Sequence, residues 1–265
     1  MNRAAHQAAD DPRYPTEALL YPEKLFGGYS HFDGGIRFYT RVNALLARSS
    51  IVLDYGCGRG FHKDLYTGYS KQLQVIRGKV QKVIGVDVDL AAQANPYIDE
   101  FKLIRNGKLL LDDGSIDICL CEWVLEHIMN VDLFFSECRR VLTPGGFLCI
   151  RTPNLLHYSS IGASLVPFGY HSALRRWLGY SHTEADVFPT FYRCNTMMNC
   201  RRTLRRFGFS PIVYAHRGES HLINCGLLLA RVGKVIESLS PSFLWHELHA
   251  FGKRLAVPDH DQQRV

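Results

Sequence analysis

A glycine-rich turn directly after an apolar run constrains this chain more than any other feature of its sequence. The stretch is IVLDYGCGRGF, residues 51–61, in which Gly56, Gly58 and Gly60 alternate with other residues. Glycines in such a turn permit tight backbone conformations and let a ligand approach the main chain closely. A helix that follows the turn presents its N-terminal amides to a negatively charged group. The stretch therefore predicts a strand, a ligand-binding turn and a helix.

The spacing of these glycines distinguishes between kinds of nucleotide-binding loop. A dinucleotide loop requires Gly-x-Gly-x-x-Gly, but the sixth position here is Phe61. A P-loop is excluded because no Gly-Lys-Ser/Thr follows. Asp54 precedes the turn, and the next apolar run, KVIGVD, ends on Asp87. An acid at the end of that strand is the expected acceptor for the hydroxyls of a ribose.

Apolar runs alternate with helical segments along the chain, which predicts a doubly wound α/β sheet with a mostly parallel core. Strands are expected at SIVLDY, KVIGVD, SIDICLC, GFLCIRT, PIVYAH and CGLLLA, and helices at IRFYTRVNALLA and VDLFFSECRRVL. The expected divisions are an N-terminal tail and helical cover (1–48), an α/β core (49–154), a substrate-lid insertion (155–207), the last core strands (208–233) and a C-terminal amphipathic helix with its tail (234–265).

Composition narrows the class of protein. The chain has 265 residues, of which 46% are hydrophobic and 21% charged, as in ordinary globular proteins. The first fifteen residues are polar and do not resemble a signal peptide. The eight cysteines show no paired CxxC spacing, so we expect reduced thiols in a cytoplasmic protein. The acids in DDGS, residues 112–115, fit a turn, and no metal site is expected.

The net charge of +6 is concentrated in the last third of the sequence, where basic residues outnumber acids from Arg193 onward. This excess is typical of a solvated helix face, and it would also attract an anionic substrate, a nucleic acid or a membrane surface. In SFLWHELHAFGKRLA, Leu244, Leu248, Phe251 and Leu255 recur at helical spacing. Such a stripe packs on its own domain or a partner subunit, and peripheral membrane contact stays open.

Four blocks of sequence carry a family resemblance. They are VLDYGCGRG, VIGVDVD, DDGSIDICLCEWVLEHI and RVLTPGGFLCIRTPN, which occur in this order between Ser50 and Asn154. The chain resembles the class I S-adenosylmethionine-dependent methyltransferases of the small-molecule type. The flanking stretches LFGGYSHFDGGIRFYTRV and DVFPTFYRCNT are similar to a bacterial subgroup of unknown substrate. The resemblance implies a Rossmann-like, doubly wound seven-stranded sheet with an insertion after the fifth strand, and S-adenosylhomocysteine as product.

The resemblance also assigns residues to the cofactor. It places Asp54 and the backbone of the glycine turn at the methionine half, Asp87 at the ribose and Val88 beside the adenine. The family often has an adenine-binding acid after the third strand, but the corresponding LIRNGK has none. Asn106 is the alternative acceptor there. The implied cofactor residues are Asp54, Gly56, Cys57, Gly58, Gly60, Asp87, Val88, Asn106 and Cys121, the last through its backbone.

The implied reaction is an in-line displacement at the methyl carbon of a sulfonium, in which the protein supplies alignment and excludes water. A hydroxyl acceptor needs a base, for which His127 and Glu122 are the catalytic candidates. Packing or capping of a helix would equally explain the Glu126-His127 pair. The candidate acceptor-binding residues, each of which also has a structural explanation, are Tyr29, Arg37, His157, Tyr158, His171, Tyr192 and Arg193.

Two rival functions belong to other classes. The first is an RNA methyltransferase whose basic C-terminal third grips phosphates. The segment after the fourth strand, Cys-Glu-Trp, lacks the motifs of DNA methyltransferases, which argues against a nucleic-acid substrate. The second is a non-catalytic partner protein, against which the intact glycine turn and Asp87 argue. We expect a monomer or homodimer that methylates a small or carrier-linked acceptor, such as a sugar or glycan hydroxyl.

Overall fold

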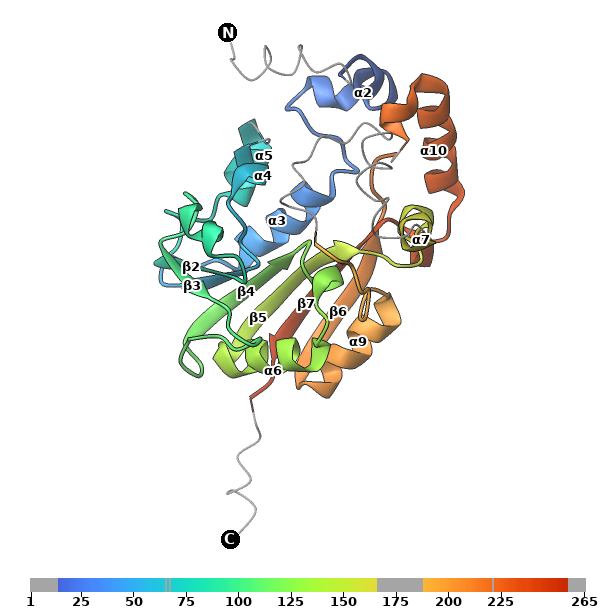
Figure 1. Cartoon of the computed structure of the whole chain (residues 1–265). Helices are drawn as coiled ribbons and strands as arrows, with labels where there is room; N and C mark the ends of the chain where they lie inside the picture. Colours follow the sequence, from blue (N-terminus) through green and yellow to red (C-terminus); the bar gives the residue numbers. More distant parts are fainter. Residues whose placement is uncertain (1–13, 65, 67, 166–187, 221, 257–265) are drawn as a thin grey trace.

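A single mixed sheet forms the centre of the molecule. The computed structural model describes residues 14–64, 66, 68–165, 188–220 and 222–256 (Figure 1). In these residues seven strands form a sheet of order β3-β2-β1-β4-β5-β7-β6, in which β7 runs antiparallel to both neighbours. The strands are β1 (Ile51–Tyr55), β2 (Lys82–Asp87), β3 (Glu100–Leu103), β4 (Ile116–Glu122), β5 (Leu142–Pro153), β6 (Phe209–His216) and β7 (Glu247–Arg254). The predicted doubly wound seven-stranded sheet is confirmed.

Helices cover both faces of the sheet (Figure 1). The α-helices are α2 (Tyr14–Leu20), α3 (Gly34–Leu45), α4 (Phe61–Asp64), α5 (Gly68–Gln74), α6 (Val131–Val141), α7 (Tyr158–Leu165), α9 (Met197–Arg206) and α10 (Leu227–Leu239). Single 3-10 turns are η1 (Pro22–Leu25), η2 (Leu90–Ala94), η3 (Leu125–His127), η6 (Ile223–Cys225) and η7 (Ser242–Leu244). No helix in the described residues is long and apolar enough to cross a membrane.

The central strands are apolar on both faces because helices bury both. Neighbouring residues of β1 show the alternation. Val52 belongs to a buried cluster with Phe38 of α3, whereas Leu53 belongs to a second cluster with Phe134 of α6 and Leu204 of α9. The helix α3 thus covers one face of the sheet, and α6 and α9 cover the other. This packing leaves the carboxyl ends of the parallel strands as one edge, where open α/β sheets bind ligands.

The C-terminal part of the sequence folds differently from our expectation. The predicted amphipathic helix through Leu244, Leu248, Phe251 and Leu255 is wrong, because residues 247–254 form strand β7. Both faces of this strand are covered, so apolar residues occur on each face. Their positions in the sequence coincide with the spacing of an amphipathic helix. Leu248 is fully buried, and Phe251 packs against the α3 face of the sheet.

The expected strand at CGLLLA, residues 225–230, is also wrong. Gly226 has a φ of 94°, and the helix α10 begins at the next residue. A short apolar run does not by itself distinguish a buried strand from a helix segment, and here the chain continues helically to Leu239.

The segment assigned to a substrate lid, 155–207, contains two described helices. The second of them, α9, packs Cys200 and Leu204 into the sheet core and is therefore part of the α/β domain. The predicted lid boundary at Phe207 must move to a point before α9. His171 lies outside the described residues.

Candidate active site

The glycine turn connects β1 to α4 at the carboxyl edge of the sheet. Gly56, Gly58 and Gly60 have φ values of 72°, 51° and 81°. A Cβ added to Gly56 would lie 2.4 Å from Cγ2 of Val124, whereas one added to Gly58 would have no atom within 4 Å. Gly56 is therefore required for packing, and the Cα of Gly58 faces open space at the edge where a ligand would lie.

Asp87 ties this turn to the end of β2. Its Oδ2 accepts a hydrogen bond from the amide of Gly58 at 2.9 Å, and its Oδ1 accepts one from the amide of Asp89 at 2.9 Å. The residue is 8% exposed. A carboxylate has about four acceptor positions, so two amides leave capacity for the hydroxyls of a ribose.

Asn95 holds the glycine turn by hydrogen bonds. The sequence analysis did not identify this residue. Its Nδ2 donates to the carbonyl oxygens of Cys57 at 2.8 Å and Gly58 at 3.1 Å, and its Oδ1 accepts from the amide of Tyr97. A Cβ on Gly60 would lie 2.6 Å from that Oδ1. The Asn-Pro pair at this position indicates a turn in sequence, but only the fold shows that the turn carries the glycine loop.

Asp54, predicted at the methionine half, forms an ion pair with Lys63 of α4. Their Oδ2 and Nζ atoms are 3.0 Å apart, and Lys63 is only 5% exposed. Burial lowers the pKa of Lys63, but Asp54 opposes it and the resulting pKa lies above the usual value. The pair places a fixed ammonium group beside the turn. Lys63 is the second site residue that sequence reasoning missed.

Glu122 at the end of β4 belongs to a buried network of charges. Its Oε2 accepts a hydrogen bond from the hydroxyl of Tyr39 at 2.6 Å, and its Oε1 lies 2.8 Å from Nη1 of Arg151. Arg151 also pairs with Glu247 of β7 at 2.9 Å. Burial raises the pKa of Glu247, but Arg151 and His249 hold it well below its usual range. These contacts hold the carboxylate of Glu122 in one position. Glu122 is therefore better suited to orienting neighbouring groups than to a task that requires its side chain to move.

Trp123, directly after β4, adopts a conformation that is rare for an aromatic residue. Its φ is 54°, and its amide donates to the carbonyl of Arg151 at 2.8 Å. The guanidinium of Arg151 lies 5.0 Å from the centre of the indole ring. Strained backbone of this kind clusters at functional sites. Positive φ at a tryptophan has no sequence signal, which explains why it was not predicted.

His127 ends the short 3-10 helix η3, and α6 begins only at Val131. Its Nδ1 is 2.8 Å from the carbonyl of Pro189, and its ring contacts Phe188. The neighbouring Glu126 is 4% exposed and accepts a hydrogen bond from Thr152 at 2.9 Å. Burial raises the pKa of Glu126 to about 7.

The remaining predicted cofactor residues have separate environments. Val88 is 64% exposed beside Asp87 and offers an apolar surface at the end of β2. Asn106 has a φ of 53° and is followed by Gly107 at 72°, in a tight turn between the bridged residues 105 and 108. This turn explains Asn106, and its adenine contact stays a prediction. The side chain of Cys121 is fully buried, which leaves the backbone assigned to it.

The described acceptor-binding candidates have different neighbours in the structure. His157 is 1% exposed, and its Nε2 lies 2.7 Å from Glu237 of α10, so it joins α7 to α10 in this structure. The ring of Tyr158 lies tilted against that imidazole, with ring centres 4.1 Å apart. Tyr29 lies beside Tyr69, with ring centres 5.8 Å apart.

The other three described candidates lie in separate parts of the chain. Arg37 is exposed at the start of α3. Tyr192 has a φ of 49°, and its amide donates to the carbonyl of Glu126. Arg193 lines an open groove with residues of α6 and α9. The roles of all these residues in substrate binding stay predictions. Among the described residues, no group of three or more His, Cys, Asp or Glu side chains could hold a metal ion.

The strand order, the glycine turn after β1 and the acid that ends β2 together define a class I methyltransferase fold. Residues 53–150 match the family model described as "Methyltransferase domain". Residues 53–150 therefore carry a methyltransferase domain, and the sheet that contains them has the class I methyltransferase fold.

Proteins with similar sequences also carry methyltransferase names. A Mycolicibacterium smegmatis protein named "Probable S-adenosylmethionine-dependent methyltransferase" is 37% identical over 160 residues, which are 56% of this chain and 57% of that protein. A ubiquinone biosynthesis O-methyltransferase of Agrobacterium fabrum is 30% identical over 103 residues, covering 39% of this chain and 40% of that protein. The chain thus spans about half the length of these curated relatives.

The fold also has solved counterparts. A SAM-dependent methyltransferase from Archaeoglobus fulgidus superposes with a TM-score of 0.52 at 17% identity, covering 88% of this chain and 97% of that one. At this identity the likeness shows the fold alone.

Proposed function

We propose that this protein binds S-adenosylmethionine in the glycine turn and transfers its methyl group to a hydroxyl of a small or carrier-linked molecule. The observation that carries the proposal is the joint geometry of the turn: Gly58 faces open space, and Asp87 binds its amide while keeping acceptor capacity. Asn95 fixes the turn from the other side. A turn held this firmly is preorganised for a ligand.

In this proposal, different residues around the turn bind different parts of the cofactor. Asp87 accepts the ribose hydroxyls, and the exposed Val88 packs on the adenine. Asp54 and Lys63, paired at 3.0 Å, face the charged methionine end with one anion and one cation. Gly58 gives the cofactor close access to the main chain.

Bound S-adenosylmethionine supplies an electrophilic methyl carbon, so the chain's own residues have to align the acceptor and remove its proton. His127 suits the second task. Its Nδ1–H donates to the Pro189 carbonyl, because a carbonyl only accepts, and its Nε2 lies 3.9 Å from Oε1 of the buried Glu126. The fixed Glu122–Arg151 pair and the strained Trp123 orient the acceptor at the end of β4.

Two independent arguments support a hydroxyl group as the methyl acceptor. A base at the end of β4 is needed for a hydroxyl and not for a neutral amine. The Agrobacterium fabrum relative carries an O-methyltransferase name, although it matches over less than half of each chain. A phenolic acceptor therefore joins the sugar or glycan hydroxyl as a candidate.

Turnover tests the proposal directly. We expect S-adenosylhomocysteine to accumulate when the enzyme receives S-adenosylmethionine with a phenol or sugar acceptor, and not without one. His127→Gln should reduce kcat and leave the affinity for S-adenosylhomocysteine unchanged. Turnover only with RNA would support the rival RNA enzyme, and cofactor binding without turnover on any acceptor would support a non-catalytic partner.

A further inference from the structure

The helix α10 shows an unusual distribution of apolar residues. It packs on the protein through a narrow stripe of small or paired residues, Ala230, Gly233 and Glu237, which are all buried. Glu237 pairs there with His157. At about 100° per residue these three positions share one side of the helix. Next to them, the half-buried Leu227 and Lys234 contact Tyr21.

The outward side of α10 is apolar. Its exposed apolar residues fall within about 120° of arc, centred opposite the buried stripe. Single exposed apolar residues are ordinary, but a continuous face of this kind marks an interaction surface. The apolar arc consists of Leu228, Leu229, Val232, Val235, Ile236 and Leu239, which are 42–80% exposed.

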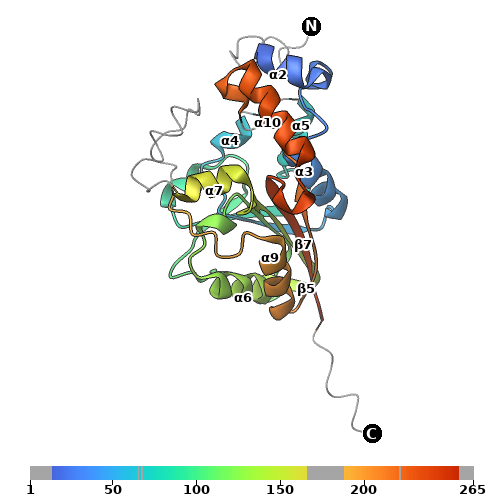
Figure 2. The same ribbon diagram turned by 90° about the vertical axis from the view of Figure 1, so that its right-hand side faces the viewer.

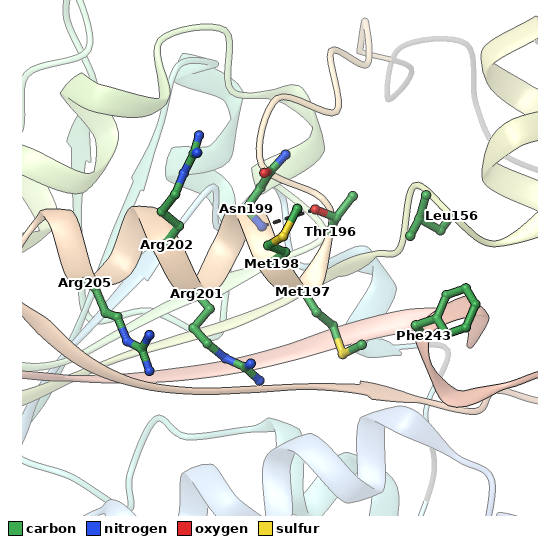
Figure 3. A pocket seen from close by; sticks show the side chains of 9 residues that line it. All are labelled: Leu156, Thr196, Met197, Met198, Asn199, Arg201, Arg202, Arg205 and Phe243. Atoms are coloured by element: carbon green, nitrogen blue, oxygen red, sulfur yellow. Dashed lines mark hydrogen bonds between the residues drawn. The ribbon is translucent and has the colours of Figure 1, made fainter.

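A groove beside α9 lies on the same side of the molecule as α10 (Figure 2). After α10 the chain turns through η7, where Phe243 is 50% exposed and forms part of the groove wall with Leu156 and Met197 (Figure 3). The groove has a volume of about 770 Å³. Figure 2 shows α7, α9 and α10 on the same side of the molecule. The apolar arc and the groove thus belong to one side of the molecule and are linked along the chain by η7.

Arginines supply the polar part of this surface. Arg201, Arg202 and Arg205 of α9 line the groove and are exposed (Figure 3). Arg201 donates to the carbonyl of Val213, while Arg202 and Arg205 have no carboxylate partner among the described residues. Within those residues, neither the groove lining nor the exposed surface of α10 contains an acid. Two guanidinium groups without a carboxylate partner in the described part of the chain complement an anionic, amphiphilic surface.

We propose that this surface docks the protein peripherally on a membrane that contains anionic phospholipid. The apolar arc of α10 enters the boundary between headgroups and acyl chains, and Arg202 and Arg205 bind lipid phosphates. A second copy of the chain fits less well. A symmetric dimer brings the same patch together twice, and a patch without carboxylates leaves its arginines unpaired.

Vesicle co-sedimentation in the absence of S-adenosylmethionine tests the proposal independently of catalysis. We expect the full chain to sediment with phosphatidylcholine vesicles that contain phosphatidylglycerol, and to dissociate as the salt concentration rises. The triple variant Leu228→Ser, Val232→Ser, Leu239→Ser should partition at least tenfold less. These side chains are exposed, so the fold should persist, which far-UV circular dichroism checks. The control Leu90→Ser, Leu110→Ser alters equally exposed leucines outside the surface and should bind normally.

The arginines are tested separately. Arg202→Gln, Arg205→Gln should weaken binding to anionic vesicles about fivefold per charge, since each basic residue near such a surface contributes roughly 1 kcal/mol. Arg48→Gln, Arg105→Gln removes two exposed arginines elsewhere and should have little effect. The proposal fails if wild type does not sediment with anionic vesicles at low salt, or if the triple variant binds as wild type does. It also fails if light scattering finds a dimer that the triple variant dissociates and neither form binds vesicles.

Discussion

Individual glycines in the turn after β1 have different tasks, although all three have positive φ. Gly56 is enclosed by Val124, and Gly58 is open on the side where we place the cofactor. The sequence pattern alone treats the two alike. The difference between their roles depends on which atoms the fold brings near each Cα, and substitutions can measure it.

We predict that Gly58→Ala lowers the affinity for S-adenosylhomocysteine by about tenfold or more, a loss of about 1.4 kcal/mol. The new methyl group would occupy space that the ligand needs. Calorimetry measures this loss. Gly114→Ala is the matched control, because Gly114 also has a positive φ, 61°, and no atom within 4 Å of an added Cβ. Both variants should be destabilised by about 1–2 kcal/mol, and equal cofactor affinity in the two would contradict the assignment of Gly58.

Glu126 gives the stability of the protein a defined pH dependence. Burial raises its pKa to about 7, against 4.5 in the unfolded chain. The folded state therefore binds this proton more tightly, so its contribution to stability is complete below pH 4.5 and is lost as pH rises to about 7. The difference corresponds to about 3 kcal/mol.

Glu126→Gln should remove this pH dependence. We expect the variant to resemble wild type at pH 4.5 and to have a free energy of unfolding higher by up to about 3 kcal/mol at pH 8.5. Urea denaturation at both pH values measures the change, with the exposed Asp112→Asn as control. A variant that is less stable than wild type at pH 8.5 would show that the carboxylate is ionised and stabilising.

At the level of elements, α3 is tied to the sheet by its first residue. A Cβ on Gly34 would lie 1.5 Å from Oε1 of Glu247, which is buried with Arg151. Alanine in a helix usually stabilises, but here it would push Glu247 away from its partner. We predict that Gly34→Ala destabilises the protein by about 3 kcal/mol, measured by chemical denaturation.

Gly162→Ala in α7 is the matched control for this prediction. Gly162 is also helical, but an added Cβ would meet no atom within 4 Å. This substitution should be neutral or stabilising by up to about 1 kcal/mol. Equal effects of the two substitutions would mean that α3 does not pack on Glu247 as described.

The elements also show how far sequence reasoning reaches. Strands β1, β2, β4 and β5 were predictable because a parallel strand covered on both faces is a continuous apolar run. The helix α10, expected as a strand, and the strand β7, expected as a helix, were not predictable. Residues 227–230 and 244–255 are too short to distinguish the helical period from the strand period. In the candidate site, the glycine turn and Asp87 were predictable from the sequence pattern, and Asp54 from the family resemblance. Asn95, Lys63 and Trp123 act through contacts that exist only after folding.

At the level of the whole molecule, two regions have different chemistry. The carboxyl edge of the parallel strands carries fixed charges and a preorganised turn, as expected for binding a charged cofactor. The side with α9 and α10 carries the exposed apolar arc and the arginine groove (Figure 2). The C-terminal basic excess is thus partly explained: Arg201, Arg202, Arg205 and Arg206 lie exposed along α9, and the first three line the groove.

Cofactor affinity at Asp87 is the most direct test of the active site. We predict that wild type binds S-adenosylhomocysteine in titration calorimetry and that Asp87→Ala weakens the affinity by about tenfold to a hundredfold, since it removes a hydrogen-bonded charge. Asp112→Ala, an exposed acid in a turn, should bind as wild type does. Thermal unfolding confirms that Asp87→Ala is folded. An unchanged affinity in folded Asp87→Ala would contradict the placement of the cofactor at the glycine turn.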